Sequence, residues 1–162
     1  MFLSQRTRYV LEVDVREVAA SVGARYSRAA LASLPPALLL TDANRMLALS
    51  RTKGYLMART GQYPCGIIQV GDGHRVITTD LLQFLGVDDA DIRRSFAQLP
   101  PAVPLPTANA LLSLSRTTGY KLARTGQYPC TVLRLGVEYR VRKNELQRLL
   151  HLSDAPSEQA VA

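Results

Sequence analysis

Two sets of cationic and phenolic side chains recur in this sequence with the same spacing. In each set an arginine, a tyrosine and a second arginine follow at intervals of four residues, as Arg51, Tyr55, Arg59 and again as Arg116, Tyr120, Arg124. Residues four apart share one face of a helix, so each set predicts a cationic helix face. Guanidinium groups bind anions through several donors at once. A solvated helix surface would also carry such residues, but their recurrence favours a face that binds a polyanion.

The two sets belong to a longer internal repeat. Residues 50–65 agree with residues 115–130 at 13 of 16 positions, and the offset of 65 positions continues without a gap over residues 34–85 and 99–150. A repeat of this kind indicates one structural unit used twice. We therefore expect two units of the same fold, each with the same function.

Helix signals flank the arginine sets. Ser50 and Ser115 are good N-caps, and Gly61 and Gly126 supply a left-handed stop just before a proline. These signals predict a helix of about three turns. A shorter helix is expected before it in each unit, separated from it by a three-residue link and beginning at Thr41, Asp42 or Thr107.

The pattern changes after the prolines. Apolar residues separated by a glycine-containing turn predict a β-hairpin over residues 67–77 and again over 132–141. A last helix is expected to begin at Thr79–Asp80 in the first unit and at Asn144–Glu145 in the second. Helix, turn, helix, hairpin and helix make a small winged core. The predicted fold class is therefore α+β, mainly α, with two tandem winged helix-turn-helix domains.

Domain boundaries follow from the repeat. We place a helical N-terminal segment at 1–36, the two domains at 37–86 and 107–151, a helical and proline-rich linker at 87–106, and a disordered polar tail at 152–162. The linker prolines favour an extended, semi-rigid connection, after a helix through Ile92 and Phe96. An equivalent helix and proline pair precede the first unit, so the alternative is that these segments pack on the domains.

The N-terminal segment is less informative. Helical runs are expected at residues 15–22 and 25–34, ended by Gly23 and by a pair of prolines. A strand at residues 9–11 before the first of these helices would make the segment resemble the end of a third repeat unit.

The composition is that of a basic globular protein. Lys and Arg number 20 against 13 Asp and Glu, and the resulting net charge of +7 favours a polyanionic partner. The apolar runs are too short to span a bilayer and the N-terminus lacks a signal-peptide core, so we expect no membrane partner and a cytoplasmic location. The sequence has no nucleophile–base pair, metal-ligand cluster or phosphate loop. We expect no enzymatic activity, metal or cofactor.

Several isolated residues have structural interpretations. Cys65 and Cys130 occupy equivalent positions without metal-ligand spacing, and we expect them to be small buried side chains. Tyr63 and Tyr128, each beside a proline, are interpreted as packing residues. Two histidines without a catalytic or metal-binding neighbourhood are expected at the surface, His74 and His151.

Both units contain the run Ser-Arg-Thr-x-Gly-Tyr-x-x-Ala-Arg-Thr-Gly-x-Tyr-Pro, followed by Leu/Val-Gly and Tyr/His-Arg-Val. With the predicted elements, this run resembles the winged helix-turn-helix domains of excisionases and MerR-like regulators over about residues 39–85 and 104–150. The sequence departs from that family, which usually has glycine where Ala48 and Ser113 stand and a bulky aliphatic residue where Gly54 and Gly119 stand. The resemblance implies a protein that binds double-stranded DNA through two covalently joined domains.

The resemblance also implies which residues would contact DNA. The start of the second helix would reach base edges in the major groove through Arg51, Thr52, Lys53 and Arg116, Thr117, Thr118. Phosphates or groove walls would be contacted by Tyr55, Arg59, Tyr120 and Arg124. The wing tips would reach the backbone or the minor groove through His74, Arg75, Tyr139 and Arg140. From the residues alone, the two tyrosines could equally belong to the core, and Arg59 and Arg124 could cap helix carbonyls.

The second unit carries more positive charge. Lys121 and Arg134 are cations in that unit only, and residues 107–150 have a net charge of +6 against +2 for residues 41–85. We therefore expect the second unit to bind DNA more strongly alone.

Several biological roles are compatible with such a protein. The resemblance implies control of site-specific recombination on a mobile element or control of transcription, on nucleoid DNA. The tandem repeat favours direct-repeat sites, and a palindromic arrangement is the alternative. An alternative is a centromere-binding adaptor in plasmid partition, which would recruit a partition ATPase through residues 1–36. Other candidate partners are a recombinase and further copies of the chain on DNA. A winged domain can also serve only as a protein-interaction module.

Overall fold

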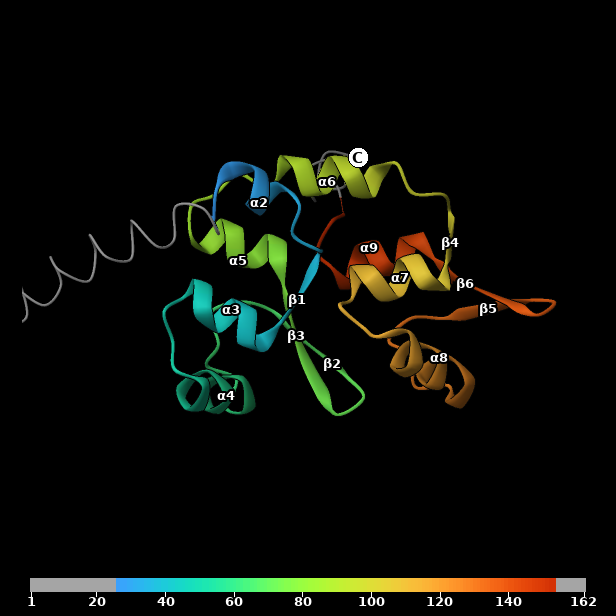
Figure 1. Cartoon of the computed structure of the whole chain (residues 1–162), viewed down its shortest axis with the longest axis horizontal. Coiled ribbons are helices and arrows are strands. Elements are labelled where there is room, and N and C mark those ends of the chain that lie inside the picture. The colour runs from blue at the N-terminus through green and yellow to red at the C-terminus, as the bar shows by residue number, and fades with distance from the viewer. Residues whose placement is uncertain (1–25, 154–162) are drawn as a thin grey trace, which may run out of the picture. The chain divides into compact units, whose positions relative to one another are not determined.

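The computed structural model describes residues 26–153 of the chain (Figure 1). The chain divides into two compact units, residues 1–33 and 34–162, and both repeats lie in the second unit. The described part is an α+β structure with eight helices and two three-stranded antiparallel sheets, which confirms the α+β part of the prediction. Helix α2 (Arg28–Ala32) in the first unit, capped by Ser27, lies within the helix predicted at 25–34. The predicted strand at 9–11 and helix at 15–22 lie outside the described residues.

The first repeat, which we call module 1, is a strand, two helices, a hairpin and a last helix. These are β1 (Ala37–Leu39), α3 (Leu40–Met46), α4 (Arg51–Arg59), β2 (Ile67–Val70), β3 (Gly73–Ile77) and α5 (Thr78–Phe84). The strands form sheet A in the order β1-β3-β2, with both pairs antiparallel. The predicted hairpin and the predicted order of helices in residues 41–85 are confirmed.

The second repeat, module 2, has the same elements in the same order. They are β4 (Ala102–Pro104), α7 (Leu105–Leu111), α8 (Arg116–Thr125), β5 (Val132–Leu135), β6 (Glu138–Arg142) and α9 (Lys143–Leu149). Sheet B has the order β4-β6-β5. In Figure 1 each hairpin projects from its module as a narrow ribbon.

The first strand of each sheet was not predicted. The sequence assigned residues 102–106 to a linker, but Ala102–Pro104 pairs with β6 and Leu105 opens α7. Proline is tolerated in this strand because β4 is an edge strand. In both modules the strand runs directly into the helix. The first helices therefore begin at Leu40 and Leu105, earlier than the predicted Thr41, Asp42 and Thr107, and without a side-chain cap.

The linker helix α6 (Ala90–Ala97) is packed against the rest of the unit. Its Ile92 and Phe96 are buried in one core with Val103 and other residues of module 2, as the predicted helix through these two positions suggested. From module 2, the Lys143 ammonium donates to the carbonyl oxygens of Ala97 at 2.8 Å and Leu99 at 2.9 Å. The connection between the modules is thus part of the fold.

Sheet A is buried on both faces. One face, with Leu38 and Val76, packs in the core of module 1. The opposite face, with Ile68, Val70 and Ile77, shares a core with module 2. In each module, we call the face of the sheet that points away from the module's own core its outer face. Because module 2 covers the outer face of sheet A, the two modules form one packed structure.

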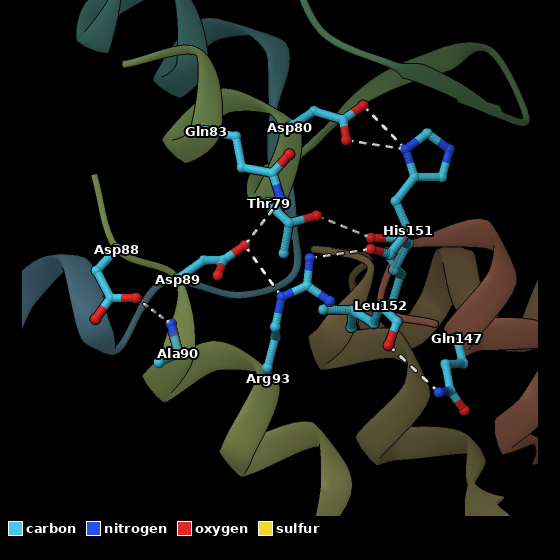
Figure 2. Close-up of polar contacts among 11 residues, drawn as sticks. Thr79, Asp80, Gln83, Asp88, Asp89, Ala90, Arg93, Gln147, His151 and Leu152 are labelled. Carbon is cyan, nitrogen blue, oxygen red and sulfur yellow. Dashed lines mark hydrogen bonds and ion pairs between the residues drawn. The ribbon is translucent and has the colours of Figure 1, made fainter. Parts of the chain in front are cut away.

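Polar contacts complete the junction between the modules. Figure 2 shows the Thr79 hydroxyl directed at a carbonyl of the α9 terminus, and this oxygen belongs to Leu150 at 3.2 Å. The His151 imidazole lies 2.9 Å from the Asp80 carboxylate. Arg93, on α6, bonds to the Asp89 carboxylate at 3.2 Å and reaches the His151 carbonyl at 3.5 Å. Three segments distant in sequence therefore meet at the C-terminus of α9.

The predicted tail begins too early. Leu152 is buried in the core of the second unit, so residues 152 and 153 continue the folded part. The rest of the predicted tail, residues 154–162, lies outside the described residues. Within residues 26–153, no helix is long and apolar enough to cross a membrane.

Candidate nucleic-acid interface

Helices α4 and α8 begin and end as predicted. The Ser50 hydroxyl accepts from the Lys53 backbone N–H at 3.2 Å, and the Ser115 hydroxyl accepts from the Thr118 N–H at the same distance. Each helix is followed by a glycine in the left-handed region, with φ of 73° and 71°. The serine caps fix the first turn of each helix, which carries the predicted base-contacting side chains.

The link between the first two helices contains a second left-handed residue in each module. Ala48 and Ser113 both have φ of 53°. Each of them directly follows the C-cap of the first helix, the usual place for a left-handed residue, and the N–H of Leu49 bonds the Asn44 carbonyl at 2.8 Å. The link spans four residues, Leu47–Ser50, rather than the predicted three. This turn sets the angle between the first and second helices of each module.

The predicted base-contacting residues are exposed in both modules: Arg51, Thr52, Lys53 and Arg116, Thr117, Thr118. Arg59, Lys121 and Arg124 are exposed on the same two helices. Within residues 26–153, none of the five arginine and lysine residues on the first and last turns of α4 and α8, nor Lys121, forms an ion pair. The cations of these helices are therefore available to an external anion.

Each first-turn arginine lies against an aromatic ring. The Arg51 guanidinium is 5.8 Å from the centroid of the Tyr55 ring, and Arg116 is 5.7 Å from that of Tyr120. Contacts of this geometry hold the arginine by cation–π attraction. The guanidinium is thus partly positioned while its donors remain free.

The same tyrosines connect the helix to the hairpin. The Tyr55 ring meets the His74 ring edge to face at a centroid distance of 6.4 Å, and Tyr120 meets Tyr139 at 6.2 Å. Both tyrosines are half-buried, so the structure places them between the core and the exposed face rather than wholly in either. A continuous row of arginine and two aromatic rings thus joins helix and hairpin in each module.

A buried polar contact joins the first helix of each module to the segment that follows the second helix. The Tyr63 hydroxyl donates to Asn44 Oδ1 at 2.9 Å, and Tyr128 donates to Asn109 at 3.0 Å. Both asparagines are buried, and their Nδ2 atoms have no hydrogen-bond partner among the described residues. Sequence reasoning did not select them. Their identity at equivalent positions of the repeat was the signal that could have found them.

The tyrosines and cysteines beside this contact are held neutral. Burial, with the charge of Cys65 as a smaller cause, raises the pKa of Tyr63 to about 12, and burial also raises the pKa of Tyr128. Burial raises the pKa of Cys65 to about 11 and that of Cys130 to about 12. The packing role predicted for Tyr63 and Tyr128 is confirmed. Cys65 is buried and Cys130 half-buried, so both act as small packing groups.

Arg75 is directed into the junction between the modules. The sequence placed His74 and Arg75 at a wing tip, but both lie within β3, and the turn of the hairpin is at Gly71 and Asp72. The Arg75 guanidinium donates to the Leu112 carbonyl at 2.9 Å and to the Ser113 carbonyl at 3.1 Å. These bonds satisfy carbonyls at the end of α7. Arg75 therefore serves as a link between modules.

The equivalent residues of module 2 are differently engaged. Tyr139 and Arg140 lie within β6 rather than at the tip, and Arg140 pairs with Glu138 at 2.5 Å. Arg134 is exposed on β5 and bonds the Gly136 carbonyl at the hairpin turn at 3.2 Å. Arg134 is thus the hairpin cation nearest a wing tip.

Two further predictions concern histidine and the last-turn arginines. His151 is exposed as expected, whereas His74 is half-buried with a buried Nδ1 that has no partner among the described residues. The capping role considered for Arg59 and Arg124 has no support within residues 26–153, because neither guanidinium bonds a helix carbonyl there.

Within the described residues, no group of three or more His, Cys, Asp or Glu side chains could hold a metal ion. Comparisons with protein-family models, curated proteins and solved structures found no match. The chemistry of the site therefore follows from its own residues: two equivalent helices, each with free cations and a capped first turn.

Proposed function

We propose that the chain binds double-stranded DNA sequence-specifically, as two tandem winged helix-turn-helix modules with α4 and α8 as recognition helices. The observation that carries this proposal is the recurrence, in both modules, of a serine-capped helix with exposed and unpaired first-turn cations. Arginine can bind the O6 and N7 atoms of guanine with two donors. Arg51 and Arg116 are the residues to which we assign this contact.

Other side chains of the helices would fix the register of the complex. Arg59 and Arg124 extend from the last turns, and contacts to phosphate from such positions orient a protein without reading sequence. Lys121 and Arg134 would add phosphate contacts in module 2 alone. Glu138 and Glu145, the partners of Arg140 and Arg142, are already subtracted in the net charge of +6 for residues 107–150. These ion pairs therefore do not change the comparison, and module 2 offers the larger positive charge to DNA.

The packed junction favours sites at one fixed spacing. The outer face of sheet A is buried in one core with residues of module 2. The two recognition helices therefore cannot move independently over large distances. A DNA site with two similar sequences repeated in the same direction would suit two modules that are tandem repeats in the chain. We propose a regulator of recombination or transcription on a mobile element, with plasmid partition as the alternative.

The proposal is tested by selecting binding sites from a random DNA duplex library. The intact chain should recover two similar motifs at constant spacing, and Arg51→Ala and Arg116→Ala should each lose one of them. Arg45→Ala and Arg94→Ala are matched controls, because both arginines are exposed but paired with aspartates outside α4 and α8. Recovery of no motif, or equal loss with the control variants, would contradict the proposal.

A further inference from the structure

The two modules carry the same pair of surfaces, but each surface is covered in only one module. In module 1 the outer face of sheet A is covered. In module 2 the covering residues form what we call the contact surface, made of the helix link, α8 and the end of α9: Leu112, Ser113, Leu114, Leu122 and Leu150. All but Ser113 are buried. The internal junction thus shows how one module binds another.

The outer face of sheet B is the uncovered counterpart of the outer face of sheet A. Leu135 stands where module 1 has Val70, and it is 56% exposed whereas Val70 is 3% exposed. Val137, at the adjacent hairpin turn, is 92% exposed. Two large apolar side chains therefore project from this hairpin without covering.

Module 1 has an uncovered counterpart of the contact surface. Leu85 stands where module 2 has Leu150, and it is 40% exposed whereas Leu150 is fully buried. Its neighbour Phe84 is 60% exposed. Leu47, in the position of the buried Leu112, is only half-buried. Most of the large exposed apolar side chains in residues 26–153 thus lie on two surfaces whose counterparts in the other module bind each other within the chain.

We propose that a second copy of the chain joins these surfaces. The outer face of sheet B of one copy would bind the contact surface of module 1 of the next, and repetition would give a head-to-tail array. Arg140 of one copy would replace Arg75 in this contact and donate to the carbonyls of Leu47 and Ala48 of the next copy. Asn144, in the position of Thr79, can donate to the Leu85 carbonyl. The contact is between protein surfaces and does not rest on DNA binding.

Sequence differences make this contact weaker than the internal one. Glu138 stands where module 1 has Gly73 and holds Arg140 in an ion pair. Arg142 replaces the apolar Ile77, and Ala48 lacks the hydroxyl with which Ser113 bonds the Ala37 carbonyl at 2.6 Å. Association is therefore reversible and depends on concentration, since Arg140 must leave Glu138 before it can bridge two chains.

Sedimentation of the full chain without DNA tests the proposal. The wild type should form a series of oligomers as concentration rises. Val137→Asp blocks one surface and Phe84→Asp the other; each variant alone should stay monomeric, and their equimolar mixture should form a 1:1 heterodimer and nothing larger. Both side chains are exposed, so circular dichroism should show native structure for each variant. A monomeric wild type, an unmixed dimer of either variant, or a mixture that stays monomeric would overturn the proposal.

A second variant should strengthen the contact. Glu138→Gly recreates the residue of module 1 and frees Arg140, and we expect about a tenfold lower dissociation constant for self-association. The control Asp91→Ala removes the partner of Arg94, an exposed pair on α6, and should leave the constant unchanged. An unchanged constant for Glu138→Gly would contradict the role assigned to Arg140. Failure of DNA selection would leave both results unaffected.

Discussion

The side-chain amide of Asn44 occupies the space that a Cβ atom at Gly54 would need. Asn109 and Gly119 have the same relationship in module 2. Glycine inside a helix costs roughly 1 kcal/mol relative to alanine, so its presence twice at this position has a local cause. That cause is the close approach of α4 to α3 and of α8 to α7, with a buried amide between them.

Replacing Gly54 with alanine should destabilise the protein although alanine favours helices. The new methyl group overlaps the Asn44 amide, and overpacking of this kind costs about 1–3 kcal/mol. Asn44→Ala in the same chain should recover part of the loss, because it removes both the overlap and an unpartnered Nδ2. Urea unfolding of the two single variants and the double variant gives the coupling energy. Additive effects would contradict this packing.

The helix link offers a matched pair of glycine substitutions. Ala48→Gly should stabilise the protein by about 1 kcal/mol, since a left-handed residue with a side chain carries a cost of that order. Ser113→Gly relieves the same backbone cost but loses the hydrogen bond to the Ala37 carbonyl. It should therefore stabilise less, or destabilise. Thermal unfolding measures both, and an equal gain in both variants would show that the Ser113 hydroxyl contributes nothing.

Loss of Arg75 should weaken the junction. Arg75→Ala removes two hydrogen bonds from a charged group to carbonyls of module 2, each worth about 1.5–3 kcal/mol at most. We expect a clear loss of stability in urea unfolding, and faster hydrogen exchange at β3 and α7. Arg140→Ala is the matched control, because its partner Glu138 is exposed. A larger loss for Arg140→Ala than for Arg75→Ala would be inconsistent with the observed contacts.

Alkaline pH should destabilise the fold. Burial raises the pKa of Cys65 from 9.0 to about 11, so the unfolded chain loses this proton at a lower pH than the folded one. The free energy of unfolding should therefore be unaffected well below pH 9 and fall between pH 9 and pH 11. Urea unfolding at pH 8 and pH 10 measures the decline, which should be smaller in a chain carrying Cys65→Ala and Cys130→Ala. An equal decline would assign the effect to the buried tyrosines.

DNA affinity should depend steeply on salt if the proposed function is right. Arg134→Ala should reduce the slope of log affinity against log salt by about 1, because one phosphate contact is lost. Arg94→Ala should leave the slope unchanged, since that arginine lies on α6 and pairs with Asp91. Equal slopes for the two variants would remove Arg134 from the interface.

Local signals in the sequence predicted the local structure well. The serine caps, the glycine stops and the apolar alternation of the hairpins gave α4, α8, β2, β3, β5 and β6 at or within a residue of their bounds. The internal repeat was decisive, because each signal occurred twice. Capping and turn formation depend on neighbouring residues, so one sequence is enough to recognise them.

Contacts between distant residues were harder to predict. Arg75 is directed into the junction between the modules, whereas the equivalent Arg140 pairs with Glu138. The repeat in the sequence could not predict this difference, because it depends on module 2 covering the outer face of sheet A. The three-residue strands β1 and β4 were missed since each directly follows a pair of prolines, which suggests irregular backbone, and only pairing with β3 and β6 makes them strands. Asn44 was missed because its partner Tyr63 lies 19 residues away.

The double burial of sheet A has a consequence for synthesis of the chain on the ribosome. Ile68, Val70 and Ile77 are made before any of the module 2 residues that cover them. Module 1 would therefore emerge with an apolar sheet face open until Leu112, Leu114 and Leu122 have followed. A chain interrupted after residue 86 would keep that face exposed permanently, which makes early termination products of this protein prone to aggregate or to be degraded.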